Sequence, residues 1–232
     1  MAEYLIFHLT AALGSMGELA GHERRGSLSW PGRSALTGML GAALGIRREG
    51  DFSELDRLRM AVAIFDTGSV LRDYHTIETV PRAAARGTQS RPDALRGARA
   101  ERRTHTAITL RDYRMAPLYG IAVWNGDLAR LAHALRQPVF TLYLGRKSCP
   151  LAAPVDPQII TASSPEAALQ SLRLPPWWRG AQARIMASDE RPDARRHEIR
   201  LDIATDRRAW HFAPRQVAMM PVEIIPEAEK ER

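Results

Sequence analysis

The chain has 232 residues, 45% of them hydrophobic and 25% charged, which allows one large domain or two small ones with a proper core. A net charge of +7 and a pI near 10.3 favour a polyanionic partner, nucleic acid first and an acidic membrane surface second. Cys149 is the only cysteine, which excludes an intrachain disulfide and a cysteine-rich metal site. There is no apolar run of membrane-spanning length and no basic leader, so we expect a soluble, cytoplasmic protein.

Residues 4–9 predict the first strand, and because both of its faces are apolar we expect it to lie centrally in a sheet. A long connection with several glycines follows over residues 10–32, and loops of this length are usually functional or mobile. Trp30, near its end, could stack on a nucleic-acid base. The alternative, which we favour, is that Trp30 anchors the loop to the core.

Residues 34–46 predict a helix with Ser34 as its N-cap. Three glycines at positions 38, 41 and 45 share one face, so we expect close contact with another backbone, in the simplest case the sheet beneath. Arg33, together with the free N–H groups of the helix start, makes a candidate anion site.

Strands are predicted at residues 61–65 and 70–77, and the character of the sequence then changes. Residues 81–104 are poor in aliphatic side chains and cannot build a core, so we expect a mobile arm in the free protein. The arginines of this arm are Arg82, Arg86, Arg91, Arg96, Arg99, Arg102 and Arg103. Its flanks, at 74–80 and 104–111, are expected to pair as a long basic hairpin that grasps nucleic acid. The alternative is a solvated, disordered loop.

A strand at 118–124, a helix at 127–136 and a strand at 139–144 complete the order strand, helix, strand, insertion, strand, helix, strand. This order predicts an α+β, ferredoxin-like (RRM-like) core, in which the first and third strands lie centrally and the helices cover one face. Such a sheet is a common platform for RNA.

The last of these strands runs into a tight basic turn at residues 145–148. Gly145 permits a positive φ or a close backbone approach, Arg146 and Lys147 supply charge, and Ser148 supplies a hydroxyl. Only one other lysine, Lys230, occurs in this arginine-rich chain. A glycine turn of this composition is a candidate contact for the phosphate backbone; the alternative is a surface turn with solvated cations.

Beyond residue 151 we expect a β-rich extension over residues 152–225 and a polar tail at 226–232. The extension predicts a helix at 165–171 capped by Ser164, and a hairpin of strands at 183–186 and 198–203. The aromatic pair Trp177 and Trp178, which follows two prolines, is either a core plug or a docking knob.

Several of these stretches together resemble the CasD family, the subunit of the type I-E CRISPR surveillance complex, Cascade, that holds the 5′ end of the guide RNA. The resemblance spans about residues 4–151. The stretches that carry it are PGRSAL at 31–36, LGAALGI at 40–46, RDYHT at 72–76 and YLGRKSCPL at 143–151, with PRQ at 214–216 as an echo. The chain departs from the family in the glycine-bearing loop, where Gln and Trp are common and this chain has Gly14 and Met16.

The resemblance implies a ferredoxin-like core over residues 1–151, with a thumb hairpin inserted at about 72–115. It also implies no catalysis and no cofactor, because a separate subunit cuts the repeat RNA. The implied partners are the 5′ handle of the crRNA, the large target-recognition subunit, the adjacent backbone subunit and, indirectly, target DNA; a membrane is not implied. We expect RNA contacts from Arg33, Ser34, Arg72, Tyr74, His75, Arg82, Arg86, Arg102, Arg103, Gly145, Arg146, Lys147 and Ser148.

The rival hypothesis is a metal-independent ribonuclease in which Tyr74 or His75 activates a 2′-hydroxyl and Lys147 stabilises the phosphorane. Relatives in another CRISPR subtype cut repeat RNA with this residue set. Tyr74 and His75 are neighbours, however, and on a strand they would face opposite ways. A nucleotide-hydrolysing site is excluded because the turn at 145–148 lacks the upstream glycine and spacing of a P-loop.

Overall fold

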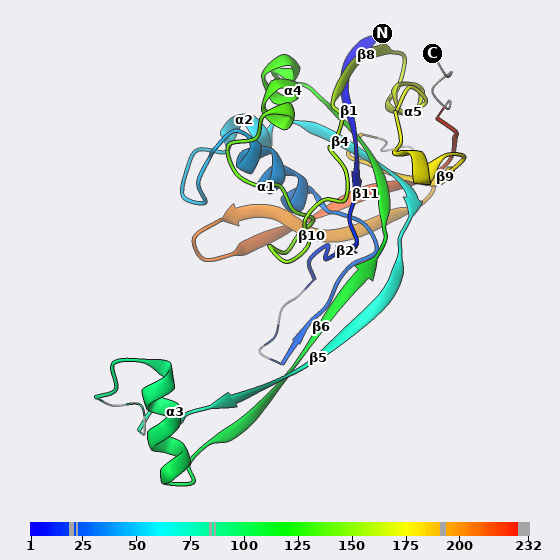
Figure 1. Ribbon diagram of the computed structural model, residues 1–232. Coiled ribbons are helices and arrows are strands. Elements are labelled where there is room, and N and C mark those ends of the chain that lie inside the picture. The colour runs from blue at the N-terminus through cyan, green and yellow to red at the C-terminus, as the bar shows by residue number, and fades with distance from the viewer. Residues whose placement is uncertain (19–20, 22, 84, 86, 191–193, 227–232) are drawn as a thin grey trace.

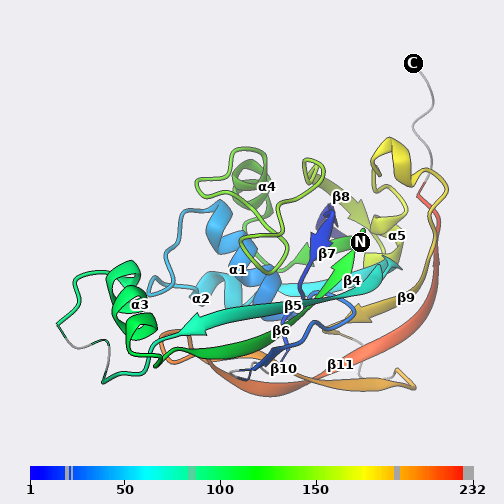
Figure 2. The ribbon, with the colours of Figure 1, turned by 60° about the horizontal axis from the view of Figure 1, so that its bottom comes forward.

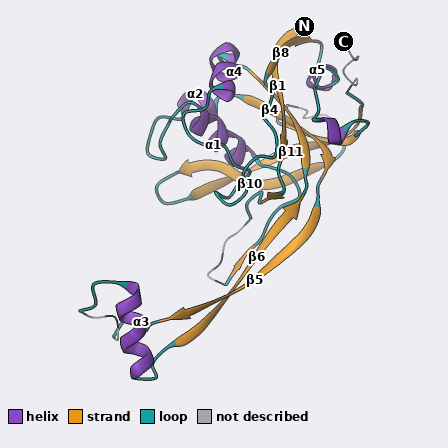
Figure 3. Ribbon diagram, in the orientation of Figure 1, coloured by secondary structure: helices purple, strands orange, loops and turns teal. Residues whose placement is uncertain are grey.

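The computed structural model describes residues 1–18, 21, 23–83, 85, 87–190 and 194–226. The fold is of the mixed α+β class and is dominated by its sheets (Figures 1 and 3). In chain order its elements are β1 (Ala2–Thr10), β2 (Leu13–Gly14), β3 (Arg24–Arg25), α1 (Arg33–Ala43), α2 (Ser53–Asp56), β4 (Arg59–Asp66), β5 (Ser69–Thr79), α3 (Arg91–Ala100), β6 (His105–Met115), β7 (Leu118–Trp124), α4 (Leu128–Arg136), β8 (Gln158–Ala162), α5 (Pro165–Leu169), the 3₁₀-helix η1 (Pro176–Trp178), β9 (Ala183–Ser188), β10 (His197–Asp206) and β11 (His211–Ile224).

The main sheet has seven strands in the order β10-β11-β9-β4-β7-β1-β8, and neighbouring strands are antiparallel. β1 and β7 lie side by side in its interior, with Leu5 opposite Val123 and Leu9 opposite Tyr119. The strands predicted at 4–9, 61–65 and 118–124 are therefore confirmed. β8 lies beyond residue 151, so the sheet continues past the point where the sequence places the end of the core.

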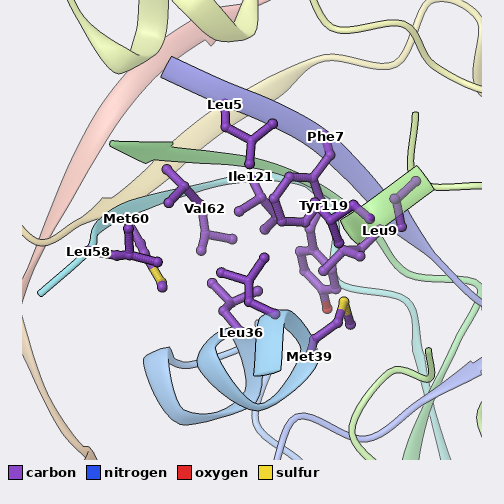
Figure 4. Close-up of a cluster of buried hydrophobic side chains, with 14 of the residues drawn as sticks. Leu5, Phe7, Leu9, Leu36, Met39, Leu58, Met60, Val62, Tyr119 and Ile121 are labelled. Atoms are coloured by element: carbon purple, nitrogen blue, oxygen red, sulfur yellow. The ribbon is translucent and has the colours of Figure 1, made fainter. Parts of the chain in front are cut away.

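The sheet has a hydrophobic core on each face. Leu5, Phe7 and Leu9 point to the face covered by α1 and α4, where Leu36 of α1 packs among them (Figure 4). The alternate residues of β1 point to the other face and pack with Ala168 and Leu169 of α5. This two-sided burial explains the continuous apolar character of β1.

The strand predicted at 139–144 is not formed. The N–H groups of Val139 and Phe140 instead donate to the carbonyls of Ala43 and Ala42, at 3.0 and 3.1 Å. These carbonyls belong to the last turn of α1, where helical partners run out. The apolar run therefore closes the end of a helix, and β8 takes the place beside β1.

The C-terminal strands are also arranged differently from the predicted hairpin. β9 and β10 do not pair with each other; β11 lies between them and pairs with both. Pro214 and Pro221 interrupt the sequence pattern of β11, which is why it was not predicted. The predicted helix at 165–171 is confirmed as α5, with the Ser164 side chain accepting from the Ala167 N–H.

β5 and β6 pair along their whole length as a ribbon that projects from the body, with α3 at its far end (Figures 1 and 2). This confirms the predicted hairpin, and we call residues 69–115 the thumb. The arm expected between the two strands contains a regular helix: Ser90 caps α3, and Ala94 and Ala98 are buried. Arg99 of α3 holds the strand through a 3.0 Å contact with Glu78.

A buried ion network joins the start of α1 to the β10–β11 hairpin. Asp189 accepts from the Arg33 guanidinium at 2.7 Å and also pairs with Arg215. Asp202 accepts from Arg215 Nε at 2.6 Å and from the Arg33 N–H at 2.7 Å. The four side chains are 8–12% exposed. A Cβ on Gly32 would lie 2.5 Å from the Asp202 carboxylate, so glycine is needed for this close approach.

The details of α1 correct three expectations. Its N-cap is Gly32, without a side-chain cap, and Ser34 lies inside the helix. Gly41 faces the Phe52 ring, whereas Gly38 contacts nothing and Gly45 lies beyond the helix end at φ +76°, so the glycines do not mark a neighbouring backbone. The helix start, expected to be a site for an external anion, is instead occupied by the carboxylate of Asp202.

Because the network is buried, Asp202→Ala should lower the free energy of unfolding by about 3–5 kcal/mol, as expected when one member of a buried ion pair is removed. The matched control is Glu54→Ala, which breaks an exposed pair with Arg130 (54% and 76% exposed) and should cost less than about 1 kcal/mol. Urea unfolding followed by circular dichroism measures both. Equal costs would show that the network does not stabilise the fold.

Candidate nucleic-acid interface

The turn at residues 145–148 is held against the loop that follows β2. Gly145 has φ +87°, and a Cβ there would overlap the carbonyl oxygen of Ser15. The Ser15 N–H in turn donates to the Leu144 carbonyl at 3.0 Å. The predicted positive φ and close approach are both present. The approaching group is the chain's own backbone, so it leaves no room for a phosphate on this side of Gly145.

The two cations of the turn differ in their surroundings. The Arg146 guanidinium donates to the carbonyls of Asp112 and Arg25, at 3.2 and 3.0 Å, and lies over the Tyr113 ring at 4.7 Å. It therefore ties the turn to the base of the thumb and to β3. Lys147 is exposed and makes no ion pair or hydrogen bond within the described residues. Its ammonium is the one in the turn that remains free to meet a ligand.

Two arginines converge on Asp112 at the base of the thumb. Arg72 makes a bidentate pair with this carboxylate, at 2.7 and 3.1 Å, and Arg24 contacts it at 3.0 Å. The hydrogen bond from Arg72 is the largest cause of a lowered Asp112 pKa, about 2; burial opposes it and Arg24 adds to it. Arg72 and Arg24 are about half exposed, so each retains N–H groups that face solvent.

Farther along the thumb, Tyr74 and His75 lie on opposite faces of the ribbon, as the sequence predicts. Tyr74 pairs across the strands with Leu110 and is 61% exposed, whereas His75 pairs with Thr109. The ribbon itself separates the two side chains. A shared catalytic site for Tyr74 and His75 therefore does not form in this arrangement.

The remaining arginines of the predicted set are scattered over the thumb tip. Arg82 and Arg102 are exposed, and Arg103 pairs with Glu101 at 3.2 Å. Arg86 lies outside the described residues. No common surface formed by this set is evident from their contacts.

A cleft of about 540 Å³ lies between α1, the turn, the loop after β2 and the tip of the β10–β11 hairpin. We call it the basic cleft. Four arginines and one carboxylate line it, and four aromatic side chains give it stacking surface. The charged residues are Arg25, Arg48, Arg146, Arg207 and Glu18, and the aromatic residues are Phe52, Tyr143, Trp210 and Phe212. Ser34 also lines the cleft, but Arg33 does not, because its side chain is committed to the ion network.

The hairpin tip supplies residues that sequence reasoning missed. Arg48 donates to the Arg207 and Arg208 carbonyls, at 2.7 and 2.8 Å, and its guanidinium lies 4.0 Å from the Trp210 ring centre. Trp210 is 60% exposed and has φ 55°. A tryptophan beside paired arginines is the aromatic and basic interleaving typical of single-strand binding, so a signal was present at residues 207–210.

Trp30, by contrast, is a core residue. It is buried, and the Arg200 guanidinium covers its ring at 4.0 Å. The neighbouring Ser29 carbonyl accepts from the buried Tyr119 hydroxyl at 2.7 Å. The interpretation that this residue anchors the loop is confirmed.

Among the helices of the described segments, none has the length and apolarity needed to traverse a bilayer.

Comparison with known proteins now places the chain. The family model for CRISPR-associated protein (Cas_Cas5) matches residues 4–218, so the chain belongs to this family. "CRISPR system Cascade subunit CasD" of Escherichia coli (strain K12) is 33% identical over 186 residues, which cover 73% of this chain and 76% of the relative.

Solved structures agree with this assignment at the level of the fold. A chain of a "CRISPR RNA-guided surveillance complex" matches with a TM-score of 0.69 and 21% identity, over 98% of this chain and 95% of that one. A "Crystal structure of Cas protein" matches with a TM-score of 0.63 and 22% identity, over 98% and 100%.

Gly145→Ala should destabilise the protein by about 2 kcal/mol or more, because the new Cβ meets the Ser15 carbonyl at a strained φ. Gly38→Ala is the control: Gly38 lies inside α1 with open space around it, so alanine should stabilise by about 0.5–1 kcal/mol. Thermal and urea unfolding report both. If Gly145→Ala were neutral, the turn would not be fixed by its contact with Ser15.

Proposed function

We propose that this chain is a non-catalytic subunit of a Cascade-type CRISPR surveillance complex, in which it holds the 5′ handle of the guide crRNA. The observation that carries the proposal is the basic cleft beside the turn, in a chain whose relative from Escherichia coli is named a Cascade subunit. The main sheet supports a ferredoxin-like core, since β8, β1, β7 and β4 follow one another as its fourth, first, third and second strands.

In this proposal, RNA is bound partly through cations that attract its phosphates and partly through aromatic rings that stack on its bases. Arg25 and Arg48 line the cleft without a carboxylate partner in the described residues, and Lys147 follows Arg146, a cleft-lining residue, in the turn. These cations would neutralise phosphates and release counterions. Tyr143 and the exposed part of Trp210, whose ring also contacts Arg48 and stacks with Phe212, would stack on unpaired bases, at about 1–3 kcal/mol for each base engaged.

The thumb would clamp the path of the RNA beyond the cleft. Arg72 and Arg24 keep exposed N–H groups while Asp112 fixes their positions, which suits a preformed phosphate contact. Arg82 and Arg102, which are exposed near the thumb tip, would add separate phosphate contacts. Arg33, one of the expected contacts, is not part of this proposal because its guanidinium is largely buried and donates to Asp189 and two carbonyls of the chain itself.

The large target-recognition subunit and the adjacent backbone subunit would be the protein partners, and target DNA would be engaged only through the complex. Assembly of such a complex requires RNA binding without cleavage. The placement of Tyr74 and His75 on opposite faces of the thumb supports this reading over the ribonuclease alternative.

Two variants should weaken RNA binding in distinguishable ways. Lys147→Ala should make the slope of log affinity against log salt shallower by about 0.7, as expected for one lost phosphate contact on a single strand. Trp210→Ala should leave the slope unchanged but lower affinity by about 5- to 150-fold, the equivalent of one lost stack.

The measurement is a salt series of fluorescence-anisotropy titrations with an RNA that begins with the repeat-derived handle. Arg184→Ala, which removes an exposed arginine on β9 outside the cleft, is the control and should match the wild type at moderate salt. If Lys147→Ala and Trp210→Ala also matched the wild type, the cleft would not be the RNA site.

The purified chain should not cut labelled repeat RNA, with or without a metal chelator. His75 has no access to the face that carries Tyr74, so these two side chains cannot act as an acid–base pair on one scissile phosphate. Site-specific cleavage that is lost in His75→Ala but kept in Arg82→Ala would refute the non-catalytic assignment. Gel analysis of the 5′-labelled RNA over time distinguishes the cases.

A further inference from the structure

A second hollow, of about 1010 Å³, lies at the opposite side of the turn from the basic cleft. It is bounded by the C-terminal end of α4 and by the loops around residues 150–157 and 173–177. Six of its lining residues are prolines: Pro138, Pro150, Pro154, Pro157, Pro175 and Pro176. We call it the proline-walled groove. The function of RNA binding makes no use of it.

The prolines give this groove two chemical properties. Each proline fixes its own φ, so the walls are preformed and lose little conformational entropy when a ligand binds. Each also lacks an N–H but keeps its carbonyl. The walls are therefore poor in the backbone donors that hold phosphates. The carbonyls of Pro157, Pro175 and Pro176 already accept hydrogen bonds from the chain itself, so the acceptors left for a peptide are those of the other prolines.

An exposed tryptophan stands at the rim. Trp177 is 62% exposed, whereas its neighbour Trp178 is half-buried and donates from Nε1 to the Thr10 hydroxyl at 3.2 Å. The aromatic pair in the sequence thus divides into an anchor and a free surface. Val139, on the facing wall, is 66% exposed. Tryptophan side chains that pack against apolar pockets are common among the binding hot spots of protein interfaces.

The charged groups of the groove indicate which charge a ligand should carry. Arg136 donates to the Pro157 carbonyl at 2.8 Å and has no carboxylate partner in the described part of the chain. Arg173, by contrast, is neutralised by Asp156 at 2.8 Å. One unmatched positive charge therefore faces the groove.

His8 supplies a further binding group in the groove wall. It is 4% exposed, and neither of its ring nitrogens makes a well-formed hydrogen bond within the described residues. Burial lowers the His8 pKa, against smaller opposing effects of Asp156 and the Arg173 backbone, so the ring is neutral at pH 7. A neutral imidazole offers one donor and one acceptor, which matches a peptide amide.

We propose that the proline-walled groove docks an extended segment of another protein subunit. An apolar side chain of that segment packs on Trp177, an acidic residue faces Arg136, and a backbone amide meets His8. The inference rests on the proposed function only in that the partner is a subunit of the same complex. Two copies of this chain, each with a net charge of +7, repel each other, and RNA finds here neither the cations nor the N–H donors of the basic cleft.

The test places a photoreactive benzophenone amino acid at position 177 in the chain co-expressed with the subunits encoded beside it. After irradiation of the purified complex, mass spectrometry should find an adduct to another protein subunit, within a segment that combines apolar and acidic residues. The same probe at Ile199, which is 74% exposed and outside the groove, should not label that segment. An adduct to RNA, an adduct to a second copy, or none would overturn the proposal.

Binding of the identified subunit, purified and without RNA, provides the quantitative arm. Trp177→Ala and Arg136→Glu should each weaken it at least tenfold, whereas the controls Ile199→Ala and Arg184→Glu should not. Both groove variants should bind the handle RNA as the wild type does. Wild-type affinity for the subunit in both groove variants would refute the groove. Loss of RNA binding by the wild-type chain would instead refute the proposed function and leave this result standing.

Discussion

The buried network of Arg33, Asp189, Arg215 and Asp202 fixes the relation between α1 and the C-terminal hairpin. Each arginine is bound by carboxylates from a different part of the chain, so removing one partner leaves a charge that is largely buried and uncompensated. Because α1 forms one wall of the basic cleft and the hairpin tip forms another, the width of the cleft depends on this network. Binding groups on two distant segments are thereby held in place before any ligand arrives.

The segment after α4 serves both sides of the molecule. Its first residues close the carbonyl end of α1, residues 143–146 line the basic cleft, and residues 138–142 with 150–151 border the proline-walled groove. The close contact between Gly145 and the Ser15 carbonyl fixes the position of this segment.

Sequence patterns correctly predicted the elements that are determined by residues close to them in the sequence. The helix capped by Asp127, the helix capped by Ser164 and the pairing of the thumb strands all follow from local signals and are present. The patterns failed where a distant partner decides. The run at 139–144 has the composition of a strand. Its first N–H groups, however, donate to the carbonyls of Ala43 and Ala42 at the end of α1 rather than to a neighbouring strand. β11 contains two prolines and is still a strand, because β10 and β9 pair with it on its two sides.

Long-range contacts also decide which residues of the motifs stabilise the fold and which remain available to bind RNA. Arg33, Arg146 and Arg215 all lie in the stretches that carry the family resemblance, yet their guanidinium groups bind carboxylates and carbonyls of the chain itself. Charge in a motif therefore did not by itself identify charge available to RNA. Around the cleft, Lys147 and Arg25 are exposed and have no carboxylate partner in the described residues, whereas Arg48, which lies over Trp210, is bound to two carbonyls. Trp210 did not stand out in the sequence. A basic side chain is available as a ligand contact only when the fold leaves some of its N–H groups exposed, as it does for Lys147 and for the half-exposed Arg72 and Arg24. Burial and pairing, rather than composition, decide that.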